Sequence, residues 1–161
     1  MALGIDIARK HERKVAFTLS DTFCVDRHRA EFLELINDGK IDILFANEAE
    51  IQMLAKTEDF EAAVAETAAK VETLIVTRSE KGAIAVRDGK TTAVAAEPVD
   101  HIIDTTGAGD LFAAGFLSGY VEQRSMEDCL TMGAVAAAEV ISHYGARPEA
   151  DLRELVKARL G

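Results

Sequence analysis

The stretch Asp104-Thr105-Thr106-Gly107-Ala108-Gly109-Asp110 decides how this sequence is interpreted, because it places two glycines and two carboxylates within seven residues. An apolar run of small and large residues, 111–117, follows directly. This order predicts a tight turn that leads into the first turn of a helix. Free N–H groups at a helix N-terminus attract anions, and glycines let a phosphate approach the backbone closely. Asp110 would then lie inside an anion site, where a carboxylate is suited to accept a proton from an incoming hydroxyl.

The same turn has a simpler interpretation, in which Asp104 or Thr106 caps a helix and the glycines only form the turn. A dinucleotide fingerprint is disfavoured, because the third glycine of G-x-G-x-x-G would fall at Phe112. The sequence contains no Gly-Lys-Ser or Gly-Lys-Thr, which excludes a Walker A loop. The anion site and the plain turn both stay open at this point.

The composition predicts one globular domain over residues 1–161, with 48% hydrophobic residues and a formal charge of −10. Such a charge disfavours binding to nucleic acid or an anionic membrane, although local backbone dipoles can still hold a small nucleotide. No apolar run approaches the roughly 20 residues of a membrane helix, and the N-terminus lacks a signal-peptide pattern. Cys24 and Cys129 show no pair spacing and are expected to be reduced. These features predict a cytoplasmic protein.

The expected elements alternate between strands and helices before the pattern changes. Helices are expected at about 2–13, 25–36, 49–55, 60–70, 110–121, 126–142 and 151–160, and strands at 14–20, 41–46, 74–77, 83–86 and 92–95. Alternating strands and helices predict parallel pairing through right-handed crossovers. Asp88-Gly89 between the last two strands predicts a hairpin. The fold class is therefore α/β, with parallel strands plus a β-hairpin.

Asn47 and Glu50 form a second constellation, at the C-terminal end of the strand expected at 41–46. Asn47 as N-cap and Glu50 three residues later fit a capping box. The alternative is functional, because open α/β sheets bind ligands at this edge. There an amide and a carboxylate would orient the waters around Mg²⁺ beside phosphates.

Two further stretches suit a nucleotide, and each has an ordinary structural alternative. The segment 77–82 is either a polar turn or a loop in which Thr77, Ser79 and Gly82 line a nucleotide, with Arg78 or Lys81 near its phosphates. Small residues in the helix 133–141 permit either close helix packing or the approach of a flat adenine ring. The histidines show no ligand spacing with the cysteines, so no zinc site is expected.

Taken together and in order, these four stretches resemble the second half of the ribokinase-like (pfkB) family of sugar and nucleoside kinases. Asp104 to Asp110 resembles the C-terminal signature of that family, and Asn47-x-x-Glu50 its Mg²⁺-phosphate motif. The segment 77–82 resembles its nucleotide loop, with Ser79 where a glycine is common. Residues 18–29 look closest to bacterial adenosine- and sugar-kinase-like members. The resemblance implies a three-layer ribokinase-like fold, whose sheet has helices on both faces.

The resemblance also implies roles for the residues. Asp110 would be the base that takes a proton from a substrate hydroxyl, and the N–H groups of Gly107, Ala108 and Gly109 would form the anion hole for the γ-phosphoryl of ATP. Mg²⁺ would be held through water by Asn47 and Glu50, and in some members a monovalent cation such as K⁺ is held at the positions of Asp104 and Thr106. The residues expected to contact the nucleotide are Thr77, Arg78, Ser79, Gly82, Gly133, Ala134, Ala137 and His143.

Members of this family are about twice as long as this sequence, and their first half carries a Gly-Gly sugar-binding motif and a small β lid. This sequence contains no Gly-Gly. We therefore expect the C-terminal, nucleotide-binding and base-bearing portion of a kinase, truncated on its N-terminal side and lacking the lid. The partner would be a sugar or a nucleoside. A homodimer stays open as an alternative, because the lid that often forms the family's dimer contact belongs to the half that this sequence lacks. Two rivals are a non-catalytic nucleotide-binding or assembly module and a folded fragment that self-associates through a sheet edge.

Overall fold

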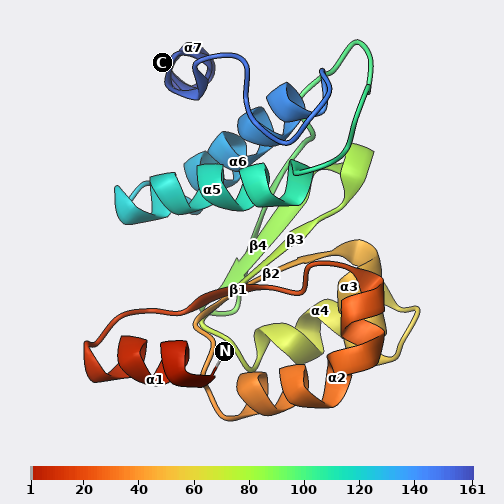
Figure 1. Ribbon diagram of the computed structural model, residues 1–161, viewed down its shortest axis with the longest axis vertical. Helices are drawn as coiled ribbons and strands as arrows, with labels where there is room; N and C mark the ends of the chain where they lie inside the picture. The colour runs from red at the N-terminus through yellow and green to blue at the C-terminus, as the bar shows by residue number, and fades with distance from the viewer. Residues whose placement is uncertain (1) are drawn as a thin grey trace. The chain divides into compact units, whose positions relative to one another are not determined.

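The computed structural model describes residues 2–161, and its elements fall into two compact units (Figure 1). The first unit contains the chain up to Val76 together with Ala85–Thr91, and the second contains Thr77–Ile84 and Thr92–Gly161. Seven α-helices and five strands are present in the described residues, in the order expected from the sequence. The α/β class is thereby confirmed, whereas the single domain over 1–161 stays a prediction.

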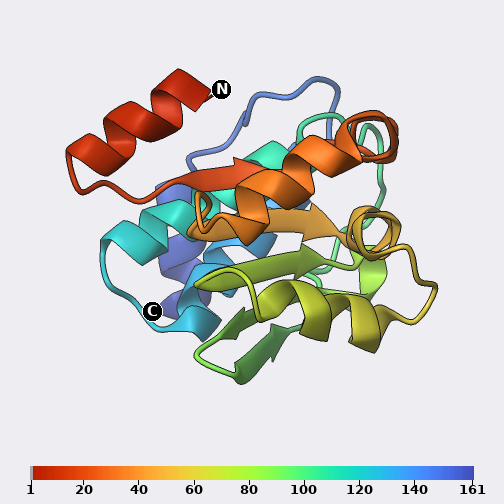
Figure 2. The same cartoon turned by 90° about the horizontal axis from the view of Figure 1, so that it is seen from below.

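The five strands form one mixed sheet in the order β1-β2-β3-β4-β5 (Figure 2). Their bounds are Ala16–Thr18 for β1, Ile43–Asn47 for β2, Thr73–Thr77 for β3, Ala83–Arg87 for β4 and Lys90–Val94 for β5. Strands β1 and β2 are parallel, with Ala16 opposite Ile43. Asp88 and Gly89 both have positive φ, 50° and 71°, which is the geometry of the tight turn predicted for the β4–β5 hairpin.

Strands β2 and β3 supply the apolar centre of the first unit. Leu44, Leu74, Ile75 and Val76 are each fully buried, as expected for strands that are covered on both faces. Strand β1 is shorter than the expected 14–20 at both ends. At its C-terminal end, Ser20 has φ 71°, which is not an extended conformation. The core of this unit therefore follows from nearly continuous hydrophobic runs.

Helices α1 to α4 of the first unit begin and end close to the expected positions. They span Ala2–Lys10, Thr22–Asn37, Glu48–Ala55 and Phe60–Ala68. Asp21 caps α2 by accepting a hydrogen bond from the Cys24 amide, and Asp59 caps α4 by accepting one from the Ala62 amide. Side-chain caps satisfy amides that the first helical turn leaves free, so these starts are set by local sequence.

The second unit contains α5 (Ala108–Val121), α6 (Met126–Val140), α7 (Leu152–Leu160) and a short 3₁₀ helix, η1 (Ser79–Lys81). Helices α5 and α6 lie side by side (Figure 1). A Cβ on Gly115 of α5 would lie 2.5 Å from the Met132 carbonyl oxygen of α6, so only glycine permits this approach. Phe116 is fully buried in the unit's core. Among the residues described, no helix is long and apolar enough to cross a membrane.

Candidate active site

Helix α5 begins at Gly107, and its start has no side-chain cap. Gly107 is the N-cap residue with φ 82°, a left-handed conformation that glycine adopts without strain, and no described side chain accepts a hydrogen bond there. Asp104 instead accepts a hydrogen bond from the Thr106 amide at 2.9 Å, which closes the turn before the helix. The interpretation in which Asp104 or Thr106 caps α5 is therefore wrong for this structure.

The amides around this helix start differ in whether they have an acceptor. The Ala108 N–H donates to the Thr105 carbonyl at 3.2 Å, whereas those of Gly107 and Gly109 have no acceptor within the described range. Apart from its chain neighbours and the nearby backbone of its own helix, no described atom lies within 4 Å of where a Cβ on Gly109 would be, so the space beside this residue is open. Two of the three predicted anion-hole amides are thus free to bind an anion, and the third is shared with Thr105.

Asp110 occupies the first turn of α5, as the third helical residue after Gly107. The residue is exposed, and its side chain makes no hydrogen bond or ion pair with any residue of the described chain. A carboxylate in this state has all of its acceptor positions available. It lies next to the open amides of Gly107 and Gly109 in the same short segment.

Asp104 connects the turn to the loop that follows α6. One carboxylate oxygen accepts the Thr106 amide, and the other accepts the Gly145 amide at 3.0 Å. The hydrogen bonds from Thr106, followed by that from Gly145, lower the pKa of Asp104 to about 2. The residue is therefore a fixed negative charge. Its predicted role with Thr106 at a monovalent cation stays a prediction.

Asn47 and Glu50 form a complete capping box at the start of α3. The Asn47 amide donates to Glu50 Oε2 at 2.9 Å, the Asn47 side-chain nitrogen donates to Oε1 at 2.6 Å, and the Glu50 amide donates to Asn47 Oδ1 at 2.8 Å. Glu50 is 4% exposed, and this burial raises its pKa despite the hydrogen bond from Asn47. Direct coordination by Glu50 does not fit this arrangement, so only the water-mediated contact with Mg²⁺ expected from the sequence is compatible with it.

The loop after β3 has a backbone that explains its residue types. Arg78 donates its amide to the Gly82 carbonyl at 2.7 Å, around the single turn of η1. Ser79 has φ 51°, which accounts for the preference for glycine at this position in the family that the sequence resembles. Gly82 has φ 85°, and a Cβ there would lie 2.0 Å from the Val94 carbonyl oxygen. Thr77 and Arg78 are half-buried at its start, and contact with a nucleotide stays a prediction.

Helix α6 uses its small residues for packing. A Cβ on Gly133 would lie 2.8 Å from the Phe112 carbonyl oxygen of α5, so the helix-packing alternative holds for this residue. Ala134 is 8% exposed and Ala137 is half-buried. Any role of these three residues beside an adenine ring remains a prediction.

His143, just beyond α6, is held by Glu139. Its Nε2 lies 3.3 Å from Glu139 Oε1, and its Nδ1 lies 3.3 Å from the Tyr144 carbonyl oxygen. Burial acts to lower the pKa of His143, but the hydrogen bonds to Tyr144 and Glu139 outweigh it and raise the pKa. This histidine is thus engaged within the chain, and its predicted contact with a nucleotide is not tested by these interactions.

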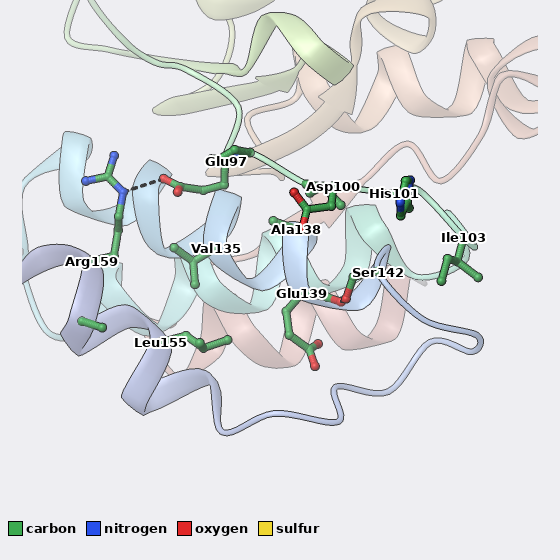
Figure 3. A pocket seen from close by; sticks show the side chains of 13 residues that line it. Glu97, Asp100, His101, Ile103, Val135, Ala138, Glu139, Ser142, Leu155 and Arg159 are labelled. Atoms are coloured by element: carbon green, nitrogen blue, oxygen red, sulfur yellow. Dashed lines mark hydrogen bonds and ion pairs between the residues drawn. The ribbon is translucent and has the colours of Figure 1, made fainter.

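A groove of about 670 Å³ lies within the second unit (Figure 3). Its walls come from segment 97–103, one face of α6, and α7. The ion pair between Glu97 and Arg159, 2.8 Å long, joins two of these walls. None of the sequence-predicted site residues lines it. In the described part of the chain, no group of three acidic, histidine or cysteine side chains is arranged to hold a metal ion.

The structure brings part of the predicted site together through the bond between Asp104 and Gly145, which joins the α5 start to the segment carrying His143. Asn47 and Glu50 belong to the first unit. The sequence interpretation missed Glu139, whose side chain is 8% exposed. A single acidic residue within the apolar run 133–141 was the available signal.

Comparison with known proteins identifies the family. The model of the pfkB family of carbohydrate kinases matches residues 1–152, so the chain belongs to the pfkB family. This result confirms the resemblance based on Asn47, segment 77–82 and the turn 104–110.

Three relatives illustrate the similarity. A probable sugar kinase from Rhizobium etli is 47% identical, with a TM-score of 0.94, over 96% of this chain and 47% of that one. Adenosine kinase from Sinorhizobium meliloti is 46% identical, with a TM-score of 0.91, over 97% of this chain and 47% of that one. Cytidine kinase from Thermococcus kodakarensis is 38% identical over 66% of this chain and 39% of its own length. The chain thus spans about two fifths of this curated relative and just under half of the two solved structures.

Proposed function

We propose that this chain supplies the phosphoryl-transfer portion of an ATP-dependent kinase that acts on a hydroxyl of a sugar or a nucleoside. The observation that carries the proposal is the start of α5. Gly107 and Gly109 offer amides without acceptors there, and Asp110 offers an unengaged carboxylate one residue later. Phosphoryl transfer depends mainly on positioning and on neutralising charge, so this set of groups suits it.

In the proposed reaction, Asp110 accepts the proton of the substrate hydroxyl. The hydroxyl oxygen forms a bond to the γ-phosphorus of ATP, and the bond from that phosphorus to the β–γ bridging oxygen breaks, which releases ADP. The amides of Gly107 and Gly109 donate to the oxygens of the phosphoryl group as it transfers. The Ala108 amide would contribute only if its 3.2 Å bond to Thr105 opened.

The nucleotide would be held by residues already in suitable conformations. Ser79 and Gly82 give the 77–82 loop a tight backbone, and Arg78 supplies a cation. Asn47 and Glu50 would orient waters of Mg²⁺, which would neutralise phosphate charge. The other residues proposed to contact the nucleotide are Thr77, Gly133, Ala134, Ala137 and His143, and those proposed at a monovalent cation are Asp104 and Thr106.

The substrate class is proposed from family membership and from the relatives. A probable sugar kinase and two nucleoside kinases are similar to this chain. We propose the class of substrate, a sugar or a nucleoside with a reactive hydroxyl. About half of the sequence of the two bacterial relatives lies outside the region shared with this chain.

The test is an assay of ADP formation from Mg²⁺-ATP with ribose, fructose, adenosine or cytidine. Turnover that depends on one of these acceptors, and that is lost in Asp110→Asn, would support the proposal. Turnover that Asp110→Asn leaves near the wild-type rate would contradict the assignment of the base.

A second candidate is a non-catalytic nucleotide-binding module. It is favoured by the extent of the match, which covers 47% of each of the two bacterial structures described above. Calorimetry with Mg²⁺-ADP discriminates between the candidates. Binding without acceptor-dependent turnover would favour the module, whereas turnover with any acceptor would exclude it.

A further inference from the structure

Glu139 is a buried charge that the proposed reaction does not use. It lies in the last turn of α6, and its side chain is 8% exposed. Figure 3 shows the side chain pointing away from Glu97 and Asp100. A carboxylate in such a position is costly unless several donors compensate it, so its partners indicate what it is for.

The partners of Glu139 belong to the loop between α6 and α7. Its Oε1 accepts the amides of Glu149 and Ala150, each at 2.8 Å, and lies 3.3 Å from His143 Nε2. Its Oε2 is buried and has no hydrogen-bond partner among the residues described. One oxygen therefore fixes the loop at both its beginning and its end.

The middle of the same loop is fixed to the turn before α5. Gly145 donates its amide to Asp104 at 3.0 Å, and the Ile103 amide donates to the Ile141 carbonyl at 2.9 Å. Ala146 follows Gly145 and lies against Gly107, since a Cβ on Gly107 would be 2.7 Å from Ala146 Cβ. The loop thus forms one wall of the helix start that carries the open amides.

We propose that Glu139 is a positioning residue for the phosphate-binding turn, which acts by holding the loop 143–150 so that Ala146 stays packed against Gly107. The inference rests on the proposed function of the α5 start. A looser loop would let Ala146 shift relative to Gly107 and would change the space beside the two free amides. Small displacements of groups that bind a reacting phosphate have large effects.

The variant Glu139→Gln keeps the size of the side chain and one acceptor oxygen. It places an NH₂ group at the buried position of Oε2, where the described residues supply no hydrogen-bond partner. The matched control is Glu97→Gln, which alters another carboxylate of the same unit. Glu97 is 16% exposed at its side chain and binds Arg159 of α7, not the 143–150 loop. Both variants should lower Tm, so stability does not distinguish them.

Two measurements test the proposal in the whole chain. In NMR spectra recorded without nucleotide, Glu139→Gln should reduce the exchange protection of the Glu149 and Ala150 amides, which bind Glu139, and should shift the amide resonances of Gly107 and Gly109. Glu97→Gln should leave all four amides unchanged. In calorimetry, Glu139→Gln should raise the Kd for Mg²⁺-ADP about tenfold or more, against less than about twofold for Glu97→Gln. Unchanged amide resonances of Gly107 and Gly109 in Glu139→Gln would overturn the proposal, and so would an unchanged Kd.

The failure of the proposed function has a separate signature. If the wild-type chain does not bind Mg²⁺-ADP, the function proposed above fails, and the amide resonances of Gly107 and Gly109 still decide whether Glu139 positions the turn. If Glu139→Gln does not fold, Ala146→Val enlarges the residue in contact with Gly107 without changing Glu139. A Kd for Mg²⁺-ADP raised about tenfold in Ala146→Val would then support the role of the contact between Ala146 and Gly107, and a Kd equal to that of the wild type would overturn it.

Discussion

The starts of α3 and α5 carry the two motifs of this chain that best fit phosphate chemistry, and they are built in opposite ways. At α3, Asn47 and Glu50 satisfy each other through three hydrogen bonds. At α5, the N-cap is a glycine without a side-chain cap, and the amides of Gly107 and Gly109 have no acceptor in the described chain. One helix start is closed by the protein's own side chains, and the other is open to a ligand.

Because of this difference, substitutions at the start of α3 should mainly affect stability, and substitutions at the start of α5 should mainly affect ligand binding. A closed capping box stabilises a helix, so its loss should appear first as a lower free energy of unfolding. Uncapped amides are a cost to stability that a bound anion removes, so changes at α5 should appear first in affinity and turnover.

Asp110→Asn should cause the largest effect of all, a loss of turnover. Removing the base should reduce turnover about a thousandfold while leaving Tm and the Kd for Mg²⁺-ADP near wild type, because the carboxylate makes no internal contact. Asp128→Asn is the matched control, since Asp128 is also the third residue of its helix, α6. Steady-state kinetics on both variants test this. Equal losses in the two would show that the helix position, and not Asp110, matters.

Gly107→Ala should lower the free energy of unfolding by about 2–3 kcal/mol and weaken nucleotide binding. The reason is twofold: φ is 82°, and the new Cβ would lie 2.7 Å from Ala146 Cβ. Gly39→Ala provides the control, because its φ of 64° is also left-handed but no other described atom lies within 4 Å of the added Cβ. Urea denaturation compares the two, and a smaller loss at Gly107 than at Gly39 would contradict the packing described.

Asn47→Ala should cost about 1–2 kcal/mol of stability, since it removes the side-chain partner of the Glu50 amide and carboxylate. Its effect on the Kd for ADP without Mg²⁺ should be small. Denaturation and calorimetry in the same buffer measure both quantities. A large loss of affinity at unchanged stability would mean that the α3 start is a binding site and not a closed cap.

Gly109→Ala should move stability and binding in opposite directions. Alanine favours a helix over glycine by up to about 1 kcal/mol, and the space around this position is open. The added methyl group would stand where a phosphate must approach the free amide, so the Kd for Mg²⁺-ADP should rise about tenfold. Thermal denaturation and calorimetry together test this, and an unchanged Kd would argue against phosphate binding at this amide.

The smallest effect concerns acid stability. The amides of Ala150 and Glu149 and the side chain of His143 outweigh burial and hold the pKa of Glu139 below its ordinary 4.5. A lowered pKa in the folded state stabilises the protein above the ordinary value, and this stabilisation is lost as the pH falls below it. Tm measured from pH 6 down to pH 3 should therefore fall less steeply in Glu139→Gln than in the wild type. Parallel curves of Tm against pH for the wild type and Glu139→Gln would contradict a negatively charged Glu139 in the folded protein.

Local features were predictable from the sequence. The order of strands and helices, the Asp88-Gly89 hairpin and the Asn47–Glu50 capping box all depend on residues that are close together in the chain. The turn 104–110 was also recognisable, since its glycines and carboxylates determine its chemistry within seven residues. These signals were sufficient for the family and for the position of the candidate base.

Contacts between distant residues were not predictable. Asp104 and Gly145 are 41 residues apart, and Glu139 reaches amides 10 and 11 residues further on. Neither pairing follows from helical or strand periodicity, because both depend on how the loop after α6 folds back. The same holds for Gly133, whose close approach to Phe112 is set by the crossing of α5 and α6.

Phosphate binding at the open start of α5 is tested most directly by an amide-resolved NMR titration of the chain with Mg²⁺-ADP and then with a non-hydrolysable ATP analogue. The amides of Gly107 and Gly109 should shift most between the two ligands, while the Glu50 amide keeps its hydrogen bond to Asn47 and shifts little. The largest shift at Glu50, with none at Gly107 and Gly109, would contradict the claim that the open start of α5 is where the phosphoryl group binds.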